Sequence, residues 1–279
     1  MSAMEENLTE EETKKEERPE EGQKACGGKP LATYVSVDIE TTGLKPGTDK
    51  IIEIGAVRVA EGEVVDTWQS LVNPGRKLSE HTMELTGMSD ELLHDAPDIG
   101  EVLPDFLRFV QEDVLLGHSV LFDYSFLKKA AVNNGYFFEK QGIDTLKLSR
   151  RFLADLESRN LGRLCAYFGI VHQAHRALGD ALATHRLYRI LCDRFYEKNV
   201  EKEFVPVPLI YKVKKETPAS PAQKERLRRL AALYHTELDV DVEKLTRNEA
   251  SRLADRIPAN RPGGALAKKE AFIYNKISE

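Results

Sequence analysis

Apolar and polar residues alternate along the segment from Val35 to Glu40. Its apolar positions are Val35, Val37 and Ile39, and its polar positions are Ser36, Asp38 and Glu40. Because successive side chains of a strand point to opposite faces, this pattern predicts a strand with Asp38 and Glu40 on one face. At ~3.3 Å per residue their Cα atoms lie roughly 6.6 Å apart, so both carboxylates can reach one cation. The end of this strand is therefore a candidate metal site.

The same patterning predicts the elements that follow. Two β-rich runs at 51–60 and 64–72, joined by a short polar segment, predict an antiparallel hairpin that pairs with the first strand. A short apolar run at 114–117 predicts one more strand. Helices are predicted at 99–112, 123–134, 160–168 and 176–196, and another begins at 144–145. Alternating strands and helices in this half predict parallel pairing through helical crossovers.

Composition divides the chain into five parts. Residues 1–30 are rich in Glu, Lys and Gly and nearly free of large apolar side chains, so we expect a disordered acidic leader. Residues 31–197 carry the strand and helix patterns of one domain. Residues 198–219 are charged and interrupted by proline, which predicts a linker that is extended at 209–213. Residues 220–260 predict a small helical module, because Ser220 with Pro221 and Thr246 with Glu249 have the spacing of helix caps; residues 261–279 form a tail.

Charge and cysteine content narrow the classes of protein. The formal net charge is −6, and residues 1–21 hold nine Glu against three basic residues, so the rest of the chain is close to neutral. The three cysteines are widely spaced, which favours neither a disulfide framework nor a zinc site. No apolar run approaches the ~18 residues of a membrane helix, and the acidic start lacks the pattern of a signal peptide. We therefore expect a cytoplasmic protein with no membrane partner.

Three short motifs carry the chemistry of the chain. DIETTG begins at Asp38, GHSVLFD ends at Asp123, and HRALGD runs from His175 to Asp180. In this order and spacing they resemble the three exonuclease motifs of the DEDDh 3′-5′ exonuclease family, which includes the DnaQ-like proofreading subunits of bacterial DNA polymerase III and ribonuclease T. The resemblance covers about residues 34–196. It implies a ribonuclease-H-like α/β domain, in which a mixed five-stranded sheet is flanked by helices, followed here by the small helical module.

The resemblance also implies a set of catalytic residues. Asp38, Glu40, Asp123 and Asp180 would hold two divalent cations, Mg²⁺ or Mn²⁺, since hard cations prefer oxygen ligands. Two such ions can activate a water and stabilise the leaving 3′ oxygen. His175 would deprotonate the attacking water, because an imidazole is neutral and basic near neutral pH. Considered without the other motifs, Asp123 would instead be interpreted as a helix N-cap.

The family's contacts to the terminal nucleotide map onto a second set of residues. They are Ile39, Thr41, Thr42, Gly43, Leu44, Thr86, Ser119, Phe122 and His175. Ser119 departs from the family, which usually has Asn at that position. A shorter side chain there would weaken a hydrogen bond to the substrate or to a loop.

These expectations combine into a function. The chain is expected to bind nucleic acid with a free 3′ end, DNA in preference to RNA, and to release 5′-mononucleotides by a two-metal hydrolysis. The alternatives are a 3′-5′ exoribonuclease of the same family, resembling ribonuclease T or oligoribonuclease, and an inactive exonuclease fold that serves as a binding module. A DNA polymerase or a repair complex is an expected partner. The helical module would hold DNA, hold a partner protein or stabilise the domain.

Overall fold

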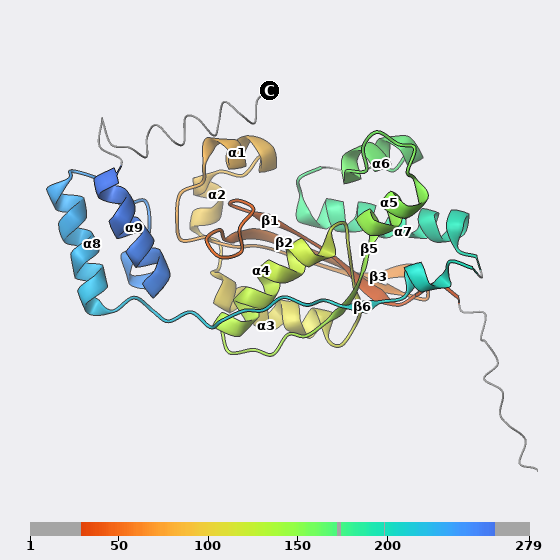
Figure 1. Cartoon of the computed structure of the whole chain (residues 1–279), viewed down its shortest axis with the longest axis horizontal. Helices are drawn as coiled ribbons and strands as arrows, with labels where there is room; N and C mark the ends of the chain where they lie inside the picture. Colours follow the sequence, from red (N-terminus) through yellow and green to blue (C-terminus); the bar gives the residue numbers. More distant parts are fainter. Residues whose placement is uncertain (1–28, 172–173, 198, 260–279) are drawn as a thin grey trace, which may run out of the picture.

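A mixed β-sheet forms the centre of the chain in a computed structural model, which describes residues 29–171, 174–197 and 199–259 (Figure 1). The predictions for the leader and the tail therefore lie outside the described residues, apart from Lys29 and Pro30. The sheet has the strand order β3-β2-β1-β4-β5-β6. Its strands are β1 (Tyr34–Thr41), β2 (Ile51–Ala60), β3 (Glu63–Leu71), β4 (Leu115–Gly117), β5 (Gln141–Asp144) and β6 (Val207–Pro208).

The pairing of the strands follows the predicted pattern. The first three strands pair antiparallel, as the hairpin prediction required, and β4 and β5 add to β1 in parallel. The register places Asp38 opposite Gly55 and Glu40 opposite Glu53, and it shifts between Glu40 and Thr41. This irregularity ends the regular pairing of β1 directly after its second carboxylate.

The sheet has six strands, so the expectation of five is wrong. The additional strand, β6, comes from the segment that was predicted to be a linker, and it pairs antiparallel with β5. Leu209 follows β6, lies almost fully buried, and donates its backbone N–H to the Lys140 carbonyl at 2.9 Å. Its side chain also packs onto Gly142, where a Cβ would lie 2.8 Å from Leu209. Burial of Leu209 therefore draws the linker onto the edge of the sheet.

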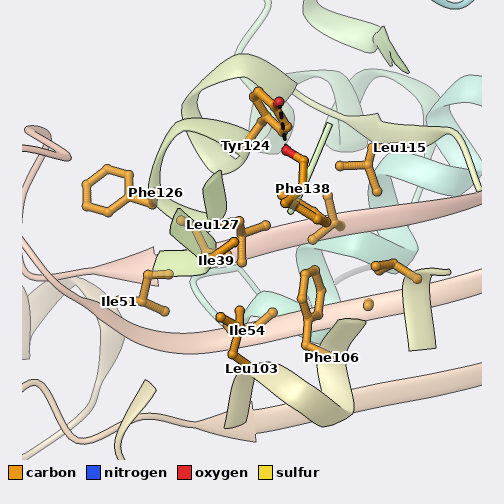
Figure 2. Packing of buried hydrophobic residues seen from close by; sticks show 14 of the residues in the cluster. Ile39, Ile51, Ile54, Leu103, Phe106, Leu115, Tyr124, Phe126, Leu127 and Phe138 are labelled. Carbon is orange, nitrogen blue, oxygen red and sulfur yellow. Dashed lines mark hydrogen bonds between the residues drawn. The ribbon is translucent and has the colours of Figure 1, made fainter. Parts of the chain in front are cut away.

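Helices cover both faces of the sheet. Odd positions of β1, including Val35, Val37 and Ile39, pack in one buried cluster with α3 (Ile99–Val110) and α4 (Val120–Asn133) (Figure 2). On the other face, Tyr34 of β1 packs in a second cluster with α5 (Thr145–Phe152), α6 (Leu161–Phe168) and α7 (Ala177–Phe195). α7 therefore packs against the face of β1 that carries Asp38 and Glu40, and these two carboxylates remain half-buried.

Several helix ends lie where the sequence placed them. Asp144 and Asn160 accept hydrogen bonds from the first backbone N–H groups of α5 and α6, and Gly169 ends α6 in the left-handed conformation. The start of α4 was predicted wrongly: the helix begins at Val120, three residues before Asp123. Two short helices, α1 (Glu80–Thr86) and α2 (Asp90–His94), follow β3. None of the helices within the described residues is both long and apolar enough to cross a membrane.

The C-terminal helices form a pair with a small core of their own. They are α8 (Pro221–Leu233) and α9 (Arg247–Ala259), preceded by the 3₁₀ turns η1 (Glu201–Phe204) and η2 (Val242–Lys244). Both predicted capping signals are present, since Ser220 caps α8 and Thr246 exchanges hydrogen bonds with Glu249 at the start of α9. Leu227, Leu245 and Ile257 lie in the core between them. Figure 1 shows this pair at one end of the molecule, away from α5, α6 and α7.

Candidate active site

Three carboxylates meet where the end of β1 faces the start of α7. Ligand oxygens of Asp38, Glu40 and Asp180 all lie within 4.8 Å of one another. The helix is held against the strand by the Ser36 hydroxyl, which donates to the Ala181 carbonyl at 2.8 Å. The period of two along β1 and the first turn of α7 thus bring together side chains that are more than a hundred residues apart in the sequence.

The structure places Asp123 in the same cleft, although not within this group of three. It lies in the first turn of α4, is buried, and accepts a hydrogen bond from the backbone N–H of Ile39 at 3.1 Å. The N-cap of α4 is Ser119, which has a left-handed φ of 76° and no side-chain capping bond. The interpretation of Asp123 as an N-cap is therefore wrong, and its carboxylate is tied to β1.

The acidic residues of the cleft raise one another's pKa. Burial is the main reason that the pKa of Asp38 lies well above its ordinary value, and the charges of Asp123, Asp180 and Glu40 add to the shift. Burial, reinforced by the charges of Asp180 and Glu53, raises the pKa of Glu40 to about 7. The pKa of Asp123 is also raised by burial, although backbone N–H donors oppose the shift. A set of crowded oxygen donors that resists full ionisation fits divalent cations, which would neutralise the repulsion.

His175 lies at the entrance of this cleft, two residues before α7. It is exposed, has a positive φ of 61°, and donates its backbone N–H to Asp180 Oδ2 at 2.9 Å. Its side chain lines the cleft together with the carboxylates. The predicted base and the predicted ligands therefore face the same space.

A buried glutamate that the sequence analysis did not single out holds the start of α7. Glu53 of β2 is 2% exposed and accepts hydrogen bonds from Arg176 Nη2 at 2.9 Å and from the Ala177 backbone N–H at 3.0 Å. The only sequence signal was a single acidic residue inside the apolar run IIEIGAV. Gly55 lies nearby, and a Cβ at that position would come within 2.2 Å of the Leu178 nitrogen. These contacts fix the helix terminus that carries His175 and Asp180.

The predicted nucleotide contacts divide into two groups. Ile39 and Phe122 line the cleft, which has a volume of about 420 Å³ and is also lined by His118, Asn160 and Gly162. Thr86 is not among the residues that line the cleft; it is buried at the end of α1, where its hydroxyl donates to the Thr82 carbonyl at 2.8 Å. Ser119 donates its backbone N–H to Asp144 Oδ1 at 3.0 Å.

Thr41 ends β1, and Thr42 to Leu44 begin the loop between β1 and β2. Thr41 Oγ1 donates to the Gly43 carbonyl at 2.7 Å, and Thr42 exchanges two hydrogen bonds with the backbone of Lys50. Leu44 is 80% exposed. An apolar side chain that projects from a hydrogen-bonded loop beside an acidic cleft is available to contact a ligand.

The fold and the acidic cleft define the ribonuclease-H-like class of exonuclease domains. A family model described as Exonuclease (RNase_T) matches residues 35–188, which is more than half of the 279 residues. The chain belongs to this family, which confirms the resemblance inferred from the three motifs.

Two curated relatives extend the comparison. The DNA polymerase III PolC-type protein of Oceanobacillus iheyensis is 40% identical over 172 residues, which are 60% of this chain and 12% of that protein. The protein of the same name from Bacillus subtilis is 39% identical over 173 residues, or 61% of this chain and 12% of the relative. The chain thus spans about an eighth of the length of these relatives.

Solved structures show the same fold at lower identity. The zinc ion bound form of an E. coli ExoI-ssDNA complex has a TM-score of 0.55 at 20% identity, covering 59% of this chain and 41% of that one. A structure described as 3′-end specific recognition of histone mRNA stem-loop by 3′-exonuclease has a TM-score of 0.51 at 20% identity, covering 60% and 84%.

Proposed function

We propose that this chain hydrolyses nucleic acid from its 3′ end, with DNA as the preferred substrate and 5′-mononucleotides as products. The observation that carries the proposal is the group formed by Asp38, Glu40 and Asp180, whose ligand oxygens lie within 4.8 Å of one another. The names of the DNA polymerase III relatives support DNA as the substrate. Solved structures with the same fold include one with single-stranded DNA and one that concerns an mRNA, so the fold itself does not select the sugar.

In this proposal the four acidic residues, Asp38, Glu40, Asp123 and Asp180, hold two divalent cations, Mg²⁺ or Mn²⁺. Such cations, when bound, lower the pKa of a coordinated water and stabilise charge on the oxygens of the phosphate. The carboxylates supply oxygen ligands from β1, α4 and α7. Because the pKa values of Asp38, Glu40 and Asp123 are raised, binding of cations would also complete the ionisation of these three carboxyl groups.

The side chains around the cations orient the substrate and accept the proton of the attacking water. His175, at the edge of the cleft, accepts the proton of the attacking water on a ring nitrogen. The water oxygen bonds to phosphorus, the bond from phosphorus to the 3′ oxygen of the preceding nucleotide breaks, and that oxygen takes up a proton from solvent to become the new 3′ hydroxyl. Ile39, Phe122 and the segment from Thr41 to Leu44 seat the terminal nucleotide beside the cleft.

Matched oligonucleotides test the proposal directly. Single-stranded DNA, duplex DNA and RNA of one sequence, labelled at either the 5′ or the 3′ end, are incubated with the full chain and Mg²⁺ or Mn²⁺. We expect release of the 3′ label as a mononucleotide, progressive shortening of the 5′-labelled DNA, slower digestion of RNA, and arrest by EDTA. Faster digestion of RNA would identify an exoribonuclease. Binding without cleavage under every metal condition would identify an inactive binding module.

The relatives also suggest a partner. We infer that a DNA polymerase or a repair complex uses this activity, since the matched region belongs to DNA polymerase III proteins that are far longer than this chain. Adding a replicative polymerase and a primed template with a mispaired 3′ end to the same assay tests this inference. Acceleration of mismatch removal supports it, and an unchanged rate speaks for independent action.

A further inference from the structure

The C-terminal helical module, residues 220–259, contacts the catalytic domain at several points, which include the ion pairs Lys77–Asp239 and Lys244–Asp98. One of these contacts is made by a buried glutamate of α9. Glu249 of α9 is 7% exposed. Its Oε1 accepts from Lys50 Nζ at 2.7 Å and from Arg76 Nη2 at 3.1 Å, and its Oε2 accepts from the Thr246 backbone and hydroxyl, each at 2.9 Å. Both carboxylate oxygens are thus used, two bonds within the module and two to the catalytic domain.

The two cations that meet Glu249 belong to the loop between β1 and β2 or support it. Lys50 ends this loop, and its backbone accepts from the Thr42 N–H at 2.8 Å and donates to Thr42 Oγ1 at 3.0 Å. Arg76 donates through Nη1 to the Thr48 carbonyl at 3.0 Å, while its Nη2 reaches Glu249. Glu249 therefore contacts the C-terminal end of the loop directly at Lys50, and it is linked to Thr48 through Arg76.

A second side chain of α9 contacts the loop independently. Arg252 Nη2 donates to the Gly47 carbonyl at 3.2 Å. Residues 42–50, called the substrate loop below, are thus held at Gly47, Thr48 and Lys50 by groups that α9 supplies or orients. The loop starts with Thr42, Gly43 and Leu44, which were predicted to contact the terminal nucleotide.

The charge of Glu249 is needed for this arrangement. Burial by itself would raise the pKa of this carboxyl, but the Lys50 ammonium and the hydrogen bonds from Lys50 and Thr246 lower it to about 2. Removing the charge of the buried Glu249 leaves two partly exposed cations, Lys50 and Arg76, without their anionic partner. Two basic residues of α8 do not contact the loop, because Lys224 and Arg228 pair with Glu243 inside the module.

We propose that the helical module acts as a brace for the substrate loop, with Glu249 as the positioning residue that links the two. The proposal rests on the function proposed above, in which this loop seats the 3′ terminal nucleotide. By holding Thr48 and Lys50, the module reduces the conformations open to Thr42, Gly43 and Leu44 before substrate arrives. Glu249 touches neither the substrate nor the cleft, so its effect appears in substrate binding and loop mobility.

Two isosteric variants of the full chain separate this role from general effects on the module. Glu249→Gln removes the charge that faces the loop, whereas Glu243→Gln removes a charge that pairs with Lys224 and Arg228 within the module. In Glu249→Gln we expect hydrogen exchange of peptide 42–50 to speed up about tenfold, KM for single-stranded DNA to rise about fivefold, and kcat to stay within about twofold. In Glu243→Gln all three quantities are expected to match the wild type. Exchange and KM unchanged in Glu249→Gln would overturn the proposal.

A double-mutant cycle and a milder variant keep the test decisive. If Lys50 acts through Glu249, Lys50→Gln added to Glu249→Gln has a smaller effect on loop exchange than Lys50→Gln alone, whereas additive effects contradict the link. If Glu249→Gln does not fold, Arg252→Gln removes the contact to Gly47 and should still speed up exchange of the loop; unchanged exchange in that variant overturns the brace. An inactive wild type would refute the proposed function, while the exchange data would still decide whether the module braces the loop.

Discussion

Asp180 illustrates how much of the candidate chemistry depends on single carboxyl groups. It is buried at the start of α7, and its charge raises the pKa of both Asp38 and Glu40. The same residue accepts the backbone N–H of His175, so it connects the proposed ligands to the proposed base. Asp180 should therefore influence metal binding, the geometry of the base and the stability of the metal-free protein.

The substitution Asp180→Asn separates these effects. We expect hydrolysis to fall by roughly a thousandfold or more, because one anionic ligand is lost. We also expect the metal-free protein to resist urea slightly better, since one repulsive charge is gone. Rates with Mg²⁺ and urea midpoints with EDTA measure the two effects. Asp193→Asn, at an exposed position of the same helix, is the control, and an Asp180 variant with full activity would remove this residue from the metal site.

The proposed role of His175 as the general base is tested by comparing the effects of a substitution on kcat and on KM. His175 lines the cleft and is exposed, so His175→Ala should leave the fold intact and should lower turnover far more than it weakens the binding of substrate. Loss of a general base lowers kcat by about 10²–10⁴-fold. Steady-state kinetics on one single-stranded DNA give kcat and KM separately. His81→Ala, at an exposed position of α1, serves as the comparison, and an unchanged kcat in His175→Ala would refute the role as base.

Among the secondary structure elements, β2 contributes to the site without supplying a predicted ligand. Glu53 lies on this strand opposite Glu40, and it accepts hydrogen bonds from the Arg176 guanidinium and from the Ala177 backbone N–H at the start of α7. Gly55 allows the backbone of α7 to approach the same strand. The position of the helix terminus relative to β1 is thus set by a third element that lies beside both.

Replacing Glu53 with Gln tests this positioning role. A neutral side chain weakens the charge-assisted bonds to Arg176, so we expect a loss of about 2 kcal/mol in the free energy of unfolding. Because the start of α7 then moves more freely, kcat should fall about tenfold, weaker Mn²⁺ binding should accompany it, and KM for DNA should change little. Titration with Mn²⁺ together with kinetics measures these effects. Glu63→Gln on β3 is the matched control, and lost stability with unchanged Mn²⁺ affinity would indicate a purely structural glutamate.

At the scale of the whole molecule, the acidic cleft links global stability to pH and to divalent cations. The pKa of Glu40 is raised from its ordinary value of 4.5 to about 7 in the folded chain, chiefly by burial. Between these values the folded state holds a proton that the unfolded state has released. Stability without metal should therefore fall as the pH rises from about 5 to 7, because the folded state binds more protons there.

Urea unfolding at pH 5.5 and 7.5 tests this linkage. In EDTA we expect the unfolding midpoint to be lower at pH 7.5, and we expect saturating Mg²⁺ to raise it more at pH 7.5 than at pH 5.5. The variant Glu40→Gln should reduce both the pH dependence and the response to Mg²⁺. A wild-type unfolding midpoint that does not change when Mg²⁺ is added at pH 7.5 would argue against a cation site in the cleft.

Local sequence features determined the parts of this protein that depend on near neighbours. The alternation around Asp38 and Glu40 placed both carboxylates on one face of a strand, and the capping residues Asn160, Ser220 and Thr246 marked the starts of helices. The three motifs also indicated the family of the chain, and the match to the family model over residues 35–188 confirms it. Such signals can be recognised in a sequence because strand periodicity and helix capping depend on residues only a few positions apart.

Only the tertiary structure decided the contacts between distant segments. β5 has four residues and β6 has two, and strands this short cannot be recognised from the periodicity of the sequence. Packing of Leu209 on Gly142 holds β6 against β5. Glu53 meets Arg176 across 123 positions, and Glu249 meets Lys50 from a module at the far end of the chain. The ion-pair partner of a charged residue cannot be predicted from the sequence, because it depends on which residues become buried and on which element packs beside them.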